Sequence, residues 1–346
     1  MSNPREEDWS MIRRRAALLR RVRQWFDRRG FVEVQPPCLS WETIPDLHID
    51  PIAVDANQLG LGESRGPQLF LQTSPEAAMK RMLAQDVPSI YSLGPVFRSG
   101  ESGALHNVEF TMLEWYQREA ALAEGIETLG SFVTEILGRD RFQCIRYRDL
   151  FRERLGFDPI DSSLATLQDR VAEIDRSLAT SLAHDRDGML DVLLTERLQS
   201  ALGLGDPMIV THYPLSQAAL ACVSEDDPQT AARFELFADG VELANGYDEL
   251  RDVAELARRF QHCNKQRVAK GRASLPLPNQ LLAAMRQRFP PCAGVALGFD
   301  RLLMVASGRH EISDVLPFPI DRASCRAEFD RCVWERYNEV SRMRNL

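Results

Sequence analysis

Lysine is almost absent from this sequence of 346 residues. Only Lys80, Lys265 and Lys270 occur, so arginine supplies nearly all of the 42 basic side chains. A Walker-type phosphate loop requires glycine and lysine at fixed spacing before a helix, and none of the three lysines lies in such a segment. The sequence therefore excludes this kind of nucleotide-binding loop.

Cysteine motifs, long apolar runs and a secretion signal are missing as well. The seven cysteines are scattered and no two have C-x-x-C spacing, which predicts free thiols in a reducing compartment. No apolar run approaches the ~18 residues that span a membrane. The start of the chain, Met1 to Asp8, is too polar and acidic for a secretion signal. We therefore expect a cytoplasmic protein that makes no contact with membranes.

The charge balance is acidic, with 50 acidic against 42 basic residues and a net charge of −8. A dedicated nucleic-acid binder usually carries a basic domain, so the balance argues mildly against one. Hydrophobic residues make up 44% of the chain and charged residues 27%, which is typical of globular proteins. The length allows one large domain or about two of average size.

Hydrophobic periodicity predicts an alternation of helices and strands. An apolar stripe from Ile12 to Phe26, with arginines opposite, predicts a helix over 9–29 that ends at Gly30. Further helices are predicted over 74–84, 252–271 and 299–307, and a mostly helical insertion over about 120–205. Strands are predicted over 31–35, 69–73, 89–98, 109–117, 207–213, 233–238, 241–246 and 294–298. Because hairpin loops join several strands, we expect an α+β fold with an antiparallel sheet flanked by helices.

Three segments carry most of the candidate chemistry. They are the helix and strand that end at Pro37, the stretch from Phe97 to Tyr116 with Arg98, Glu101, His106 and Asn107, and Gly294-Val-Ala-Leu-Gly-Phe-Asp-Arg301. Their order and spacing resemble the three motifs of class II aminoacyl-tRNA synthetases. Thr73-Ser-Pro-Glu76, Phe110-Thr-Met-Leu-Glu-Trp-Tyr116 and Glu242-Leu-Ala-Asn-Gly-Tyr-Asp-Glu249 look like the lysine-specific branch. The resemblance extends from about residue 10 to 321.

The first motif begins about ten residues into the sequence, where a lysyl-tRNA synthetase would first have an OB-fold domain that binds the anticodon. A catalytic core without that domain resembles the elongation factor P lysine ligase family. The resemblance implies that lysine, in this family (R)-β-lysine, is activated by ATP as an adenylate and transferred to a lysine of elongation factor P. It also implies a homodimer formed through residues 15–31. We expect one catalytic domain over 1–321 and a C-terminal helical extension over 322–346, with tRNA an improbable partner.

The chemistry of adenylation fits the residues that match these motifs. Two arginines, Arg98 and Arg301, can neutralise the phosphates and so act as catalytic residues. Three carboxylates can bind the two ammonium groups of a diamine. The resemblance implies that the amino acid contacts Ser74, Pro75, Glu76, Glu114, Tyr116 and Glu249. It implies that ATP contacts Arg98, Ser99, Gly100, Glu101, His106, Asn107, Glu242, Leu243, Gly298 and Arg301, and that Glu242 binds Mg²⁺.

Several positions depart from the family pattern. Gly100 stands where the family has the glutamate that is thought to contact adenine, and Glu101 follows one residue later. Ala104 and Leu105 occupy the place of an arginine near His106, and Ala296 replaces a glycine of the tRNA-charging enzymes. The methyl group of Ala296 would suit a β-amino acid. Two alternatives stay open: a catalytically impaired paralogue that serves as a binding or regulatory subunit, and a stand-alone enzyme that attaches lysine to tRNA.

Overall fold

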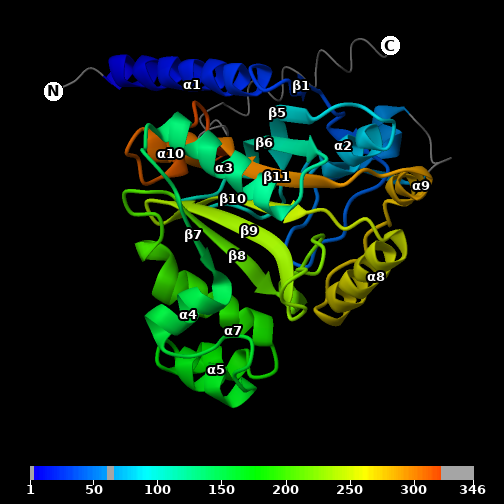
Figure 1. Cartoon of the computed structure of the whole chain (residues 1–346). Helices are drawn as coiled ribbons and strands as arrows, with labels where there is room; N and C mark the ends of the chain where they lie inside the picture. Colours follow the sequence, from blue (N-terminus) through cyan, green and yellow to red (C-terminus); the bar gives the residue numbers. More distant parts are fainter. Residues whose placement is uncertain (1–3, 61–65, 321–346) are drawn as a thin grey trace, which may run out of the picture.

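The computed structural model describes residues 4–60 and 66–320, and an eight-stranded sheet forms the centre of this part of the chain (Figure 1). The strands run across the sheet in the order β1 (Val32–Glu33), β5 (Ile90–Phe97), β6 (Glu109–Arg118), β11 (Cys292–Gly298), β10 (Val241–Asp248), β9 (Thr230–Ala238), β8 (Met208–Pro214) and β7 (Gln143–Arg146). From β5 to β8 all neighbours are antiparallel, as predicted. The edge strands β1 and β7 pair in parallel with β5 and β8, which the sequence analysis did not foresee.

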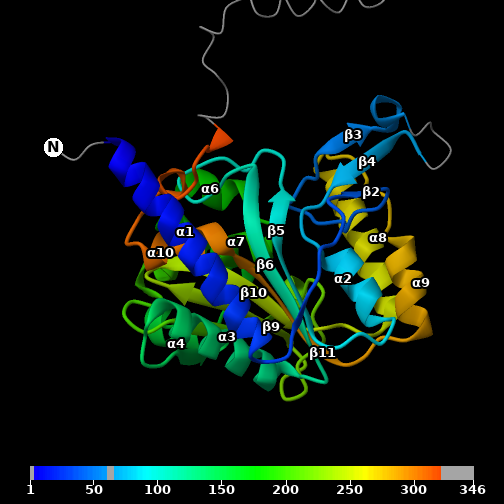
Figure 2. The ribbon, with the colours of Figure 1, turned by 90° about the horizontal axis from the view of Figure 1, so that it is seen from above.

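One face of the sheet is covered by α3 (Leu122–Leu137) and α10 (Phe299–Ala306), and α1 (Pro4–Asp27) lies across both helices (Figures 1 and 2). The apolar stripe of α1 brings Val22, Trp25 and Phe26 into the core, where Phe26 stacks on Tyr91 of β5 at 4.6 Å between ring centres. Burial of these large aromatic side chains is what holds α1 against the domain. The predicted helix is therefore present, although it begins earlier and ends at Asp27.

Beside the sheet lie three further helices and a small sheet (Figure 2). α8 (Val253–Ala269) packs against α9 (Asn279–Gln287), and α9 packs against α2 (Glu76–Leu83). The small sheet has the order β2 (Leu39–Ser40), β4 (Gln68–Leu71) and β3 (Ala53–Asp55). α2 begins at Glu76, one residue after the predicted first position, and Ser74 Oγ accepts a hydrogen bond from the Glu76 amide at 3.2 Å. The helix α9 was not predicted from the sequence.

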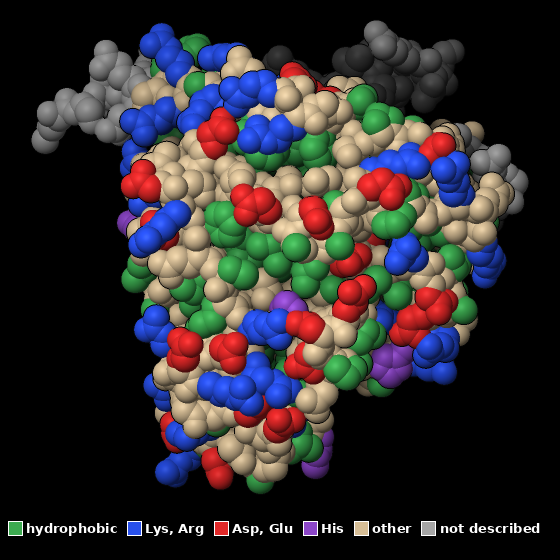
Figure 3. All heavy atoms as spheres, viewed as in Figure 1, with side chains coloured by type: hydrophobic (Ala, Val, Ile, Leu, Met, Phe, Trp, Pro, Cys, Tyr) green, Lys and Arg blue, Asp and Glu red, His purple; other side chains and the backbone are tan. Residues whose placement is uncertain are grey.

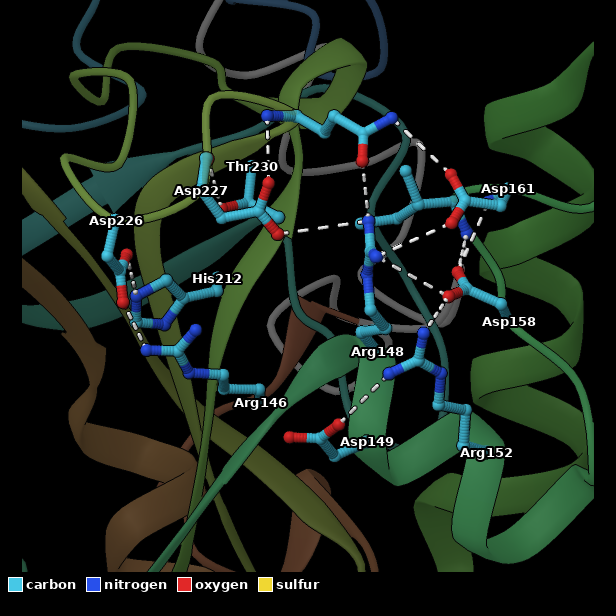
Figure 4. Close-up of polar contacts among 12 residues, drawn as sticks. Arg146, Arg148, Asp149, Arg152, Asp158, Asp161, His212, Asp226, Asp227 and Thr230 are labelled. Carbon is cyan, nitrogen blue, oxygen red and sulfur yellow. Dashed lines mark hydrogen bonds and ion pairs between the residues drawn. The ribbon is translucent and has the colours of Figure 1, made fainter.

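A separate helical layer packs next to β7 and β8 and has a hydrophobic core of its own (Figure 1). It contains α4 (Tyr147–Leu155), α5 (Leu164–Ala172), α6 (Arg176–Ser181) and α7 (Arg186–Leu193), followed by a short π-helix over Leu194–Leu198 and a 3₁₀ helix over Gln199–Ala201. Arg148 anchors α4 through contacts with Asp158, Asp161 and Asp227 (Figure 4). Asp227 belongs to the connection between β8 and β9, so the layer is tied to the sheet by charge as well as by apolar packing.

One predicted boundary, the start of the helical insertion, differs in the structure. α3 was expected within the insertion over 120–205, but its side chains, among them Leu129 and Phe132, are part of the core under α1. The segment with its own core therefore begins near Tyr147. The predicted extension over 322–346 lies outside the described residues. None of the helices in the described part of the chain combines the length and the apolar character that a membrane span needs.

Candidate functional site

A cavity of about 1730 Å³ lies on the face of the sheet opposite to α3 and α10. Its walls come from the sheet, from α2 and α8, and from the loop between β5 and β6. Three of the predicted site residues do not line it, namely Pro75, Ser99 and Gly100. The others meet there: Ser74, Glu76, Arg98, Glu101, His106, Asn107, Glu114, Tyr116, Glu242, Leu243, Glu249, Gly298 and Arg301.

Strand β11 explains why small residues alternate along one motif. Side chains of a strand point to opposite faces in turn, and Val295 and Leu297 enter the core under α3 and α10. Gly294, Ala296 and Gly298 therefore face the cavity, and all three line it. A methyl group added at Gly294 would stand 2.1 Å from Glu249 Oε1 and 2.6 Å from the Tyr116 ring. Only glycine at this position leaves room for those two side chains.

Arg301, at the start of α10, occupies one end of the cavity. Its guanidinium donates to the carbonyl oxygens of Leu105 at 3.1 Å and Glu242 at 3.0 Å, and one Nη lies 2.6 Å from His106 Nε2. Burial first, and then the positive charges of Arg301 and Arg98, lower the pKa of His106. A neutral imidazole can accept a hydrogen bond from the guanidinium, so His106 and Arg301 together fix the loop against the sheet.

Arg98 lies where β5 ends and points into the same part of the cavity. Its Nε contacts the carbonyl oxygen of Thr73 at 3.4 Å, and an Nη lies 3.6 Å from Glu101 Oε1. Glu101 lines the cavity beside Arg98, one residue later than the family glutamate, whereas Gly100 occupies a turn with φ of +77°. The cavity therefore contains a carboxylate here, although it comes one residue later in the sequence than in the family pattern.

Asn107 and Ser99 are engaged with other parts of the chain. Asn107 Nδ2 donates to the carbonyl oxygen of Glu109 at 2.6 Å, and Oδ1 accepts from the Ile320 amide at 2.9 Å. The Ser99 amide donates to the carbonyl oxygen of Asp50 at 2.8 Å. These bonds give both residues a structural role in the loop, independent of any ligand.

The other end of the cavity is acidic. Glu76 comes from α2, Glu114 from β6 and Glu249 from the segment after β10. Glu114 and Glu249 are buried, and the hydroxyl of Tyr116 donates to Glu114 Oε1 at 2.8 Å. Three carboxylates at the end of one cavity form a site for a cationic group.

Glu114 has an oxygen left for a ligand. The residue is 2% exposed, and its Oε2 has no hydrogen-bond partner among the described residues. Burial, together with the charge of Glu76, raises the pKa of Glu114 to about 8. A buried carboxylate without a partner is costly, so an incoming ammonium group would bind here strongly and would favour the ionised form.

Sequence analysis overlooked Lys80, which is 1% exposed and contacts two of these carboxylates. Its Nζ lies 2.5 Å from Glu249 Oε2 and donates to Glu76. Burial lowers the pKa of Lys80, but Glu249 and Glu76 outweigh it and the net shift is upward. The lysine therefore stays charged. The one available signal was its spacing, i and i+4 from Glu76 on a predicted helix.

Glu235, on β9, was overlooked as well. It lines the cavity near Glu242, accepts a hydrogen bond from the hydroxyl of Tyr213 at 2.6 Å and pairs with Arg233. The Glu242 side chain is 40% exposed to the cavity. Desolvation first, and then the charge of Glu235, raise the pKa of Glu242 to about 7. No group of three or more potential metal ligands occurs in residues 4–60 and 66–320.

The three motif segments are physically joined at Asp300, the neighbour of Arg301. This buried carboxylate pairs with Arg15 of α1 and accepts a hydrogen bond from the Thr111 amide of β6 at 2.6 Å. Arg15 also donates to the hydroxyl of Thr111 at 2.7 Å. One ionic cluster therefore connects the long helix, the central hairpin and the strand-helix unit that carries Arg301.

The family model and the relatives that match this chain agree with one another. Residues 4–322 match the family of class II tRNA synthetases (D, K and N). The chain is 38% identical over 310 residues to a protein of Salmonella arizonae named elongation factor P--(R)-beta-lysine ligase, covering 90% of this chain and 95% of the relative. Proteins of the same name from Yersinia enterocolitica and Proteus mirabilis are each 39% identical over the same length and coverage.

Proposed function

The chain belongs to the class II tRNA synthetase family and, within it, to the elongation factor P lysine ligases, and from this membership we propose the reaction that its cavity carries out. An ATP-dependent ligase activates lysine, in the (R)-β form, as an aminoacyl-adenylate. It then transfers the aminoacyl group to a lysine side chain of elongation factor P. The observation that carries the proposal is a single cavity with two arginines at one end and three carboxylates at the other.

In the first step, a carboxylate oxygen of the amino acid attacks the α-phosphorus of ATP, and the bond to the β-phosphate breaks to release pyrophosphate. Negative charge builds up on the α-phosphate, and Arg98 is placed to neutralise it together with the substrate carboxylate. Arg301, held by the carbonyl oxygens of Leu105 and Glu242, is placed to bind the γ-phosphate. In the second step, the acceptor amine attacks the acyl carbon and AMP leaves, which forms an amide.

The acidic end of the cavity orients the amino acid. Its two ammonium groups bind among Glu76, Glu114 and Glu249, and the free Oε2 of Glu114 is the oxygen best placed to take one of them. The Tyr116 hydroxyl keeps the other Glu114 oxygen in place. An amino acid with one ammonium group leaves a buried carboxylate unpaired, so the cavity selects a diamine.

Glu242 and Glu235 are the residues that would hold Mg²⁺. Two carboxylates fit this ion, because Mg²⁺ in phosphate-transfer sites uses one or two protein carboxylates, water and the phosphates themselves. When bound, the ion would supply charge neutralisation between the phosphates. The raised pKa of Glu242 would return toward its usual range beside a cation.

We also propose a homodimer formed along α1 and β1. Trp9 and Ile12 on α1 are 62% and 43% exposed, and Val32 at the edge strand β1 is 47% exposed. Arginine side chains cover the neighbouring surface of α1 (Figure 3), and surface arginines of this kind are the expected contacts with elongation factor P. The cytoplasmic location stays a prediction.

Lysine-dependent exchange of labelled pyrophosphate into ATP tests the proposal. A panel of α- and β-lysine isomers is compared in wild type and in Arg98→Ala. Exchange that requires a lysine isomer and Arg98 supports the ligase, whereas no exchange with any isomer indicates a catalytically silent paralogue. Transfer of labelled amino acid is then measured to elongation factor P and, separately, to tRNA. Label that reaches tRNA and not the protein would contradict the acceptor.

A further inference from the structure

Lys80 is the buried member of the three lysines in this chain. It is 1% exposed, whereas Lys265 and Lys270 on α8 and just after it are exposed. Its ammonium group contacts Glu76 of α2 and Glu249 after β10, and lies 5.8 Å from the centre of the Tyr116 ring. Lys80 is therefore surrounded by residues that already belong to the acidic end of the cavity.

Lys80 does not itself line the cavity, although Glu76, Glu249 and Tyr116 do. The ammonium group lies beneath the cavity surface and forms ion pairs with Glu76 and Glu249, two of the carboxylates that line the cavity. These carboxylates come from elements far apart in the sequence, so the ion pairs fix the spacing between α2 and the sheet at this point. Such a residue acts on a ligand only through others.

The net charge around the amine pocket determines how many ammonium groups the ligand should carry. In the substrate complex, where a bound ammonium group favours the ionised form of Glu114, three charged carboxylates surround the site, and the fixed ammonium group of Lys80 compensates one of them. Two negative charges then remain, which equals the number of ammonium groups on a lysine isomer. The substrate carboxylate adds no charge here because Arg98, at the other end of the cavity, is placed to bind it.

We propose that Lys80 is a positioning residue that sets both the charge and the spacing of the amine pocket, and thereby determines which diamino acid isomer the enzyme activates. This inference rests on the function proposed above. A residue that served only to tie α2 to the sheet would not need charge, because a buried ion pair is often no more stabilising than apolar residues of similar volume. Glu76 and Glu249, by contrast, need a fixed cationic partner whenever the substrate is absent, and Lys80 is that partner.

The first experiment replaces Lys80 by methionine, which keeps the approximate volume and removes the charge. Pyrophosphate exchange is measured with the preferred and the second-best lysine isomer. We expect Lys80→Met to raise KM for the preferred isomer at least tenfold and to lower the ratio of kcat/KM between the two isomers at least tenfold. Arg154→Met, which removes an exposed positive charge on α4 away from the cavity, is the matched control and leaves both values unchanged.

The isomer ratio separates positioning from a purely structural role. Partial unfolding lowers kcat/KM for both isomers by the same factor, so the ratio would stay constant. An unchanged ratio in a variant with reduced activity would overturn the proposal. If wild type itself shows no lysine-dependent exchange, the proposed function fails, and this outcome is distinct from a failure of the proposal on Lys80.

Chemical rescue gives a second test, in which an added alkylammonium ion should have opposite effects on Lys80→Ala and on wild type. Lys80→Ala removes three carbons and the ammonium group, a space that n-propylammonium can fill. Added n-propylammonium should restore the isomer ratio of Lys80→Ala while it only inhibits wild type, and 1-propanol should restore nothing. Rescue by the alcohol, or the absence of rescue in a folded variant, would contradict a requirement for the charge.

A third measurement leaves Lys80 unchanged, so it does not depend on whether a Lys80 variant folds. Labelling with ¹³C,¹⁵N-lysine gives three side-chain signals, and Lys265→Arg and Lys270→Arg assign the two exposed ones. We expect one ammonium signal that is protected from exchange with water and that shifts when the preferred lysine isomer is added. A Lys80 signal that exchanges freely, or that does not respond to the amino acid, would refute the proposal.

Discussion

Replacing Gly294 by alanine tests the geometry of the amine pocket most directly. The added methyl group would stand 2.1 Å from Glu249 Oε1 and 2.6 Å from the Tyr116 ring, far inside van der Waals contact. Glu249 must then move, and its ion pair with Lys80, at 2.5 Å, must lengthen. The two side chains on which the predicted diamine site depends are thus displaced together by one methyl group.

The expected size of the effect follows from the cost of overpacking. Inserting a methylene group into a packed site costs about 1–3 kcal/mol. If that cost appears in substrate binding, KM for the preferred lysine isomer rises about 5- to 150-fold, at 1.4 kcal/mol for each factor of ten. KM for ATP should stay within about twofold, because the methyl group faces the acidic end of the cavity and not the arginines.

Gly298→Ala is the matched control on the same strand face. There the nearest atom to an added methyl group is Arg301 Cδ at 3.7 Å, an ordinary contact. Gly298→Ala should therefore fold normally and should change KM for ATP rather than KM for lysine. Pyrophosphate exchange with each substrate varied in turn measures both constants, and thermal melts confirm folding. A folded Gly294→Ala enzyme with an unchanged KM for lysine would refute the placement of Glu249 and Tyr116 in the amine pocket.

Three further predictions concern the same cavity. Arg98→Ala should lower the rate of pyrophosphate exchange about 100-fold or more, with a melting temperature close to that of wild type; near-normal exchange would exclude phosphate neutralisation by Arg98. The pKa of Glu114 is raised to about 8, so the folded protein holds a proton that the unfolded chain releases above its usual pKa near 4.5. Stability without ligand should thus fall as pH rises from about 5 to 8, and melts of Glu114→Gln across this range should show a smaller fall; equal slopes would contradict burial as the cause. Ala296→Gly should shift the preference from β-lysine toward α-lysine, and an unchanged preference in the isomer panel would dispose of the methyl group's role.

The sequence predicted the centre of the fold better than its edges. The β5–β6 hairpin and the small-residue strand β11 were predicted because alternation and glycine content mark them locally. β7 has four residues, mostly exposed, and so carries no alternating pattern. It is a strand because β8 offers a parallel partner, which no local pattern reveals. The helix α3 shows apolar periodicity, but nothing in its sequence says which core it joins.

The cavity residues also differ in whether a local sequence pattern or only the tertiary structure identifies them. Arg98, Glu114, Glu249 and Arg301 belong to motifs with characteristic spacing, so the sequence could assemble them through the family pattern. Lys80 has no such mark, since its burial depends on Glu249, which arrives from a distant segment. Charged residues on a predicted helix are ordinarily solvated, and only the tertiary structure reveals this exception.

The ionic cluster at Asp300 connects α1, the helix of the proposed dimer interface, to Arg301 in the cavity. Arg15, which reaches Asp300, belongs to the same helix that would meet a second copy of the chain, and Asp300 directly precedes Arg301. A change at Asp300 would therefore be felt both by this helix and by the neighbouring guanidinium that we propose binds the terminal phosphate.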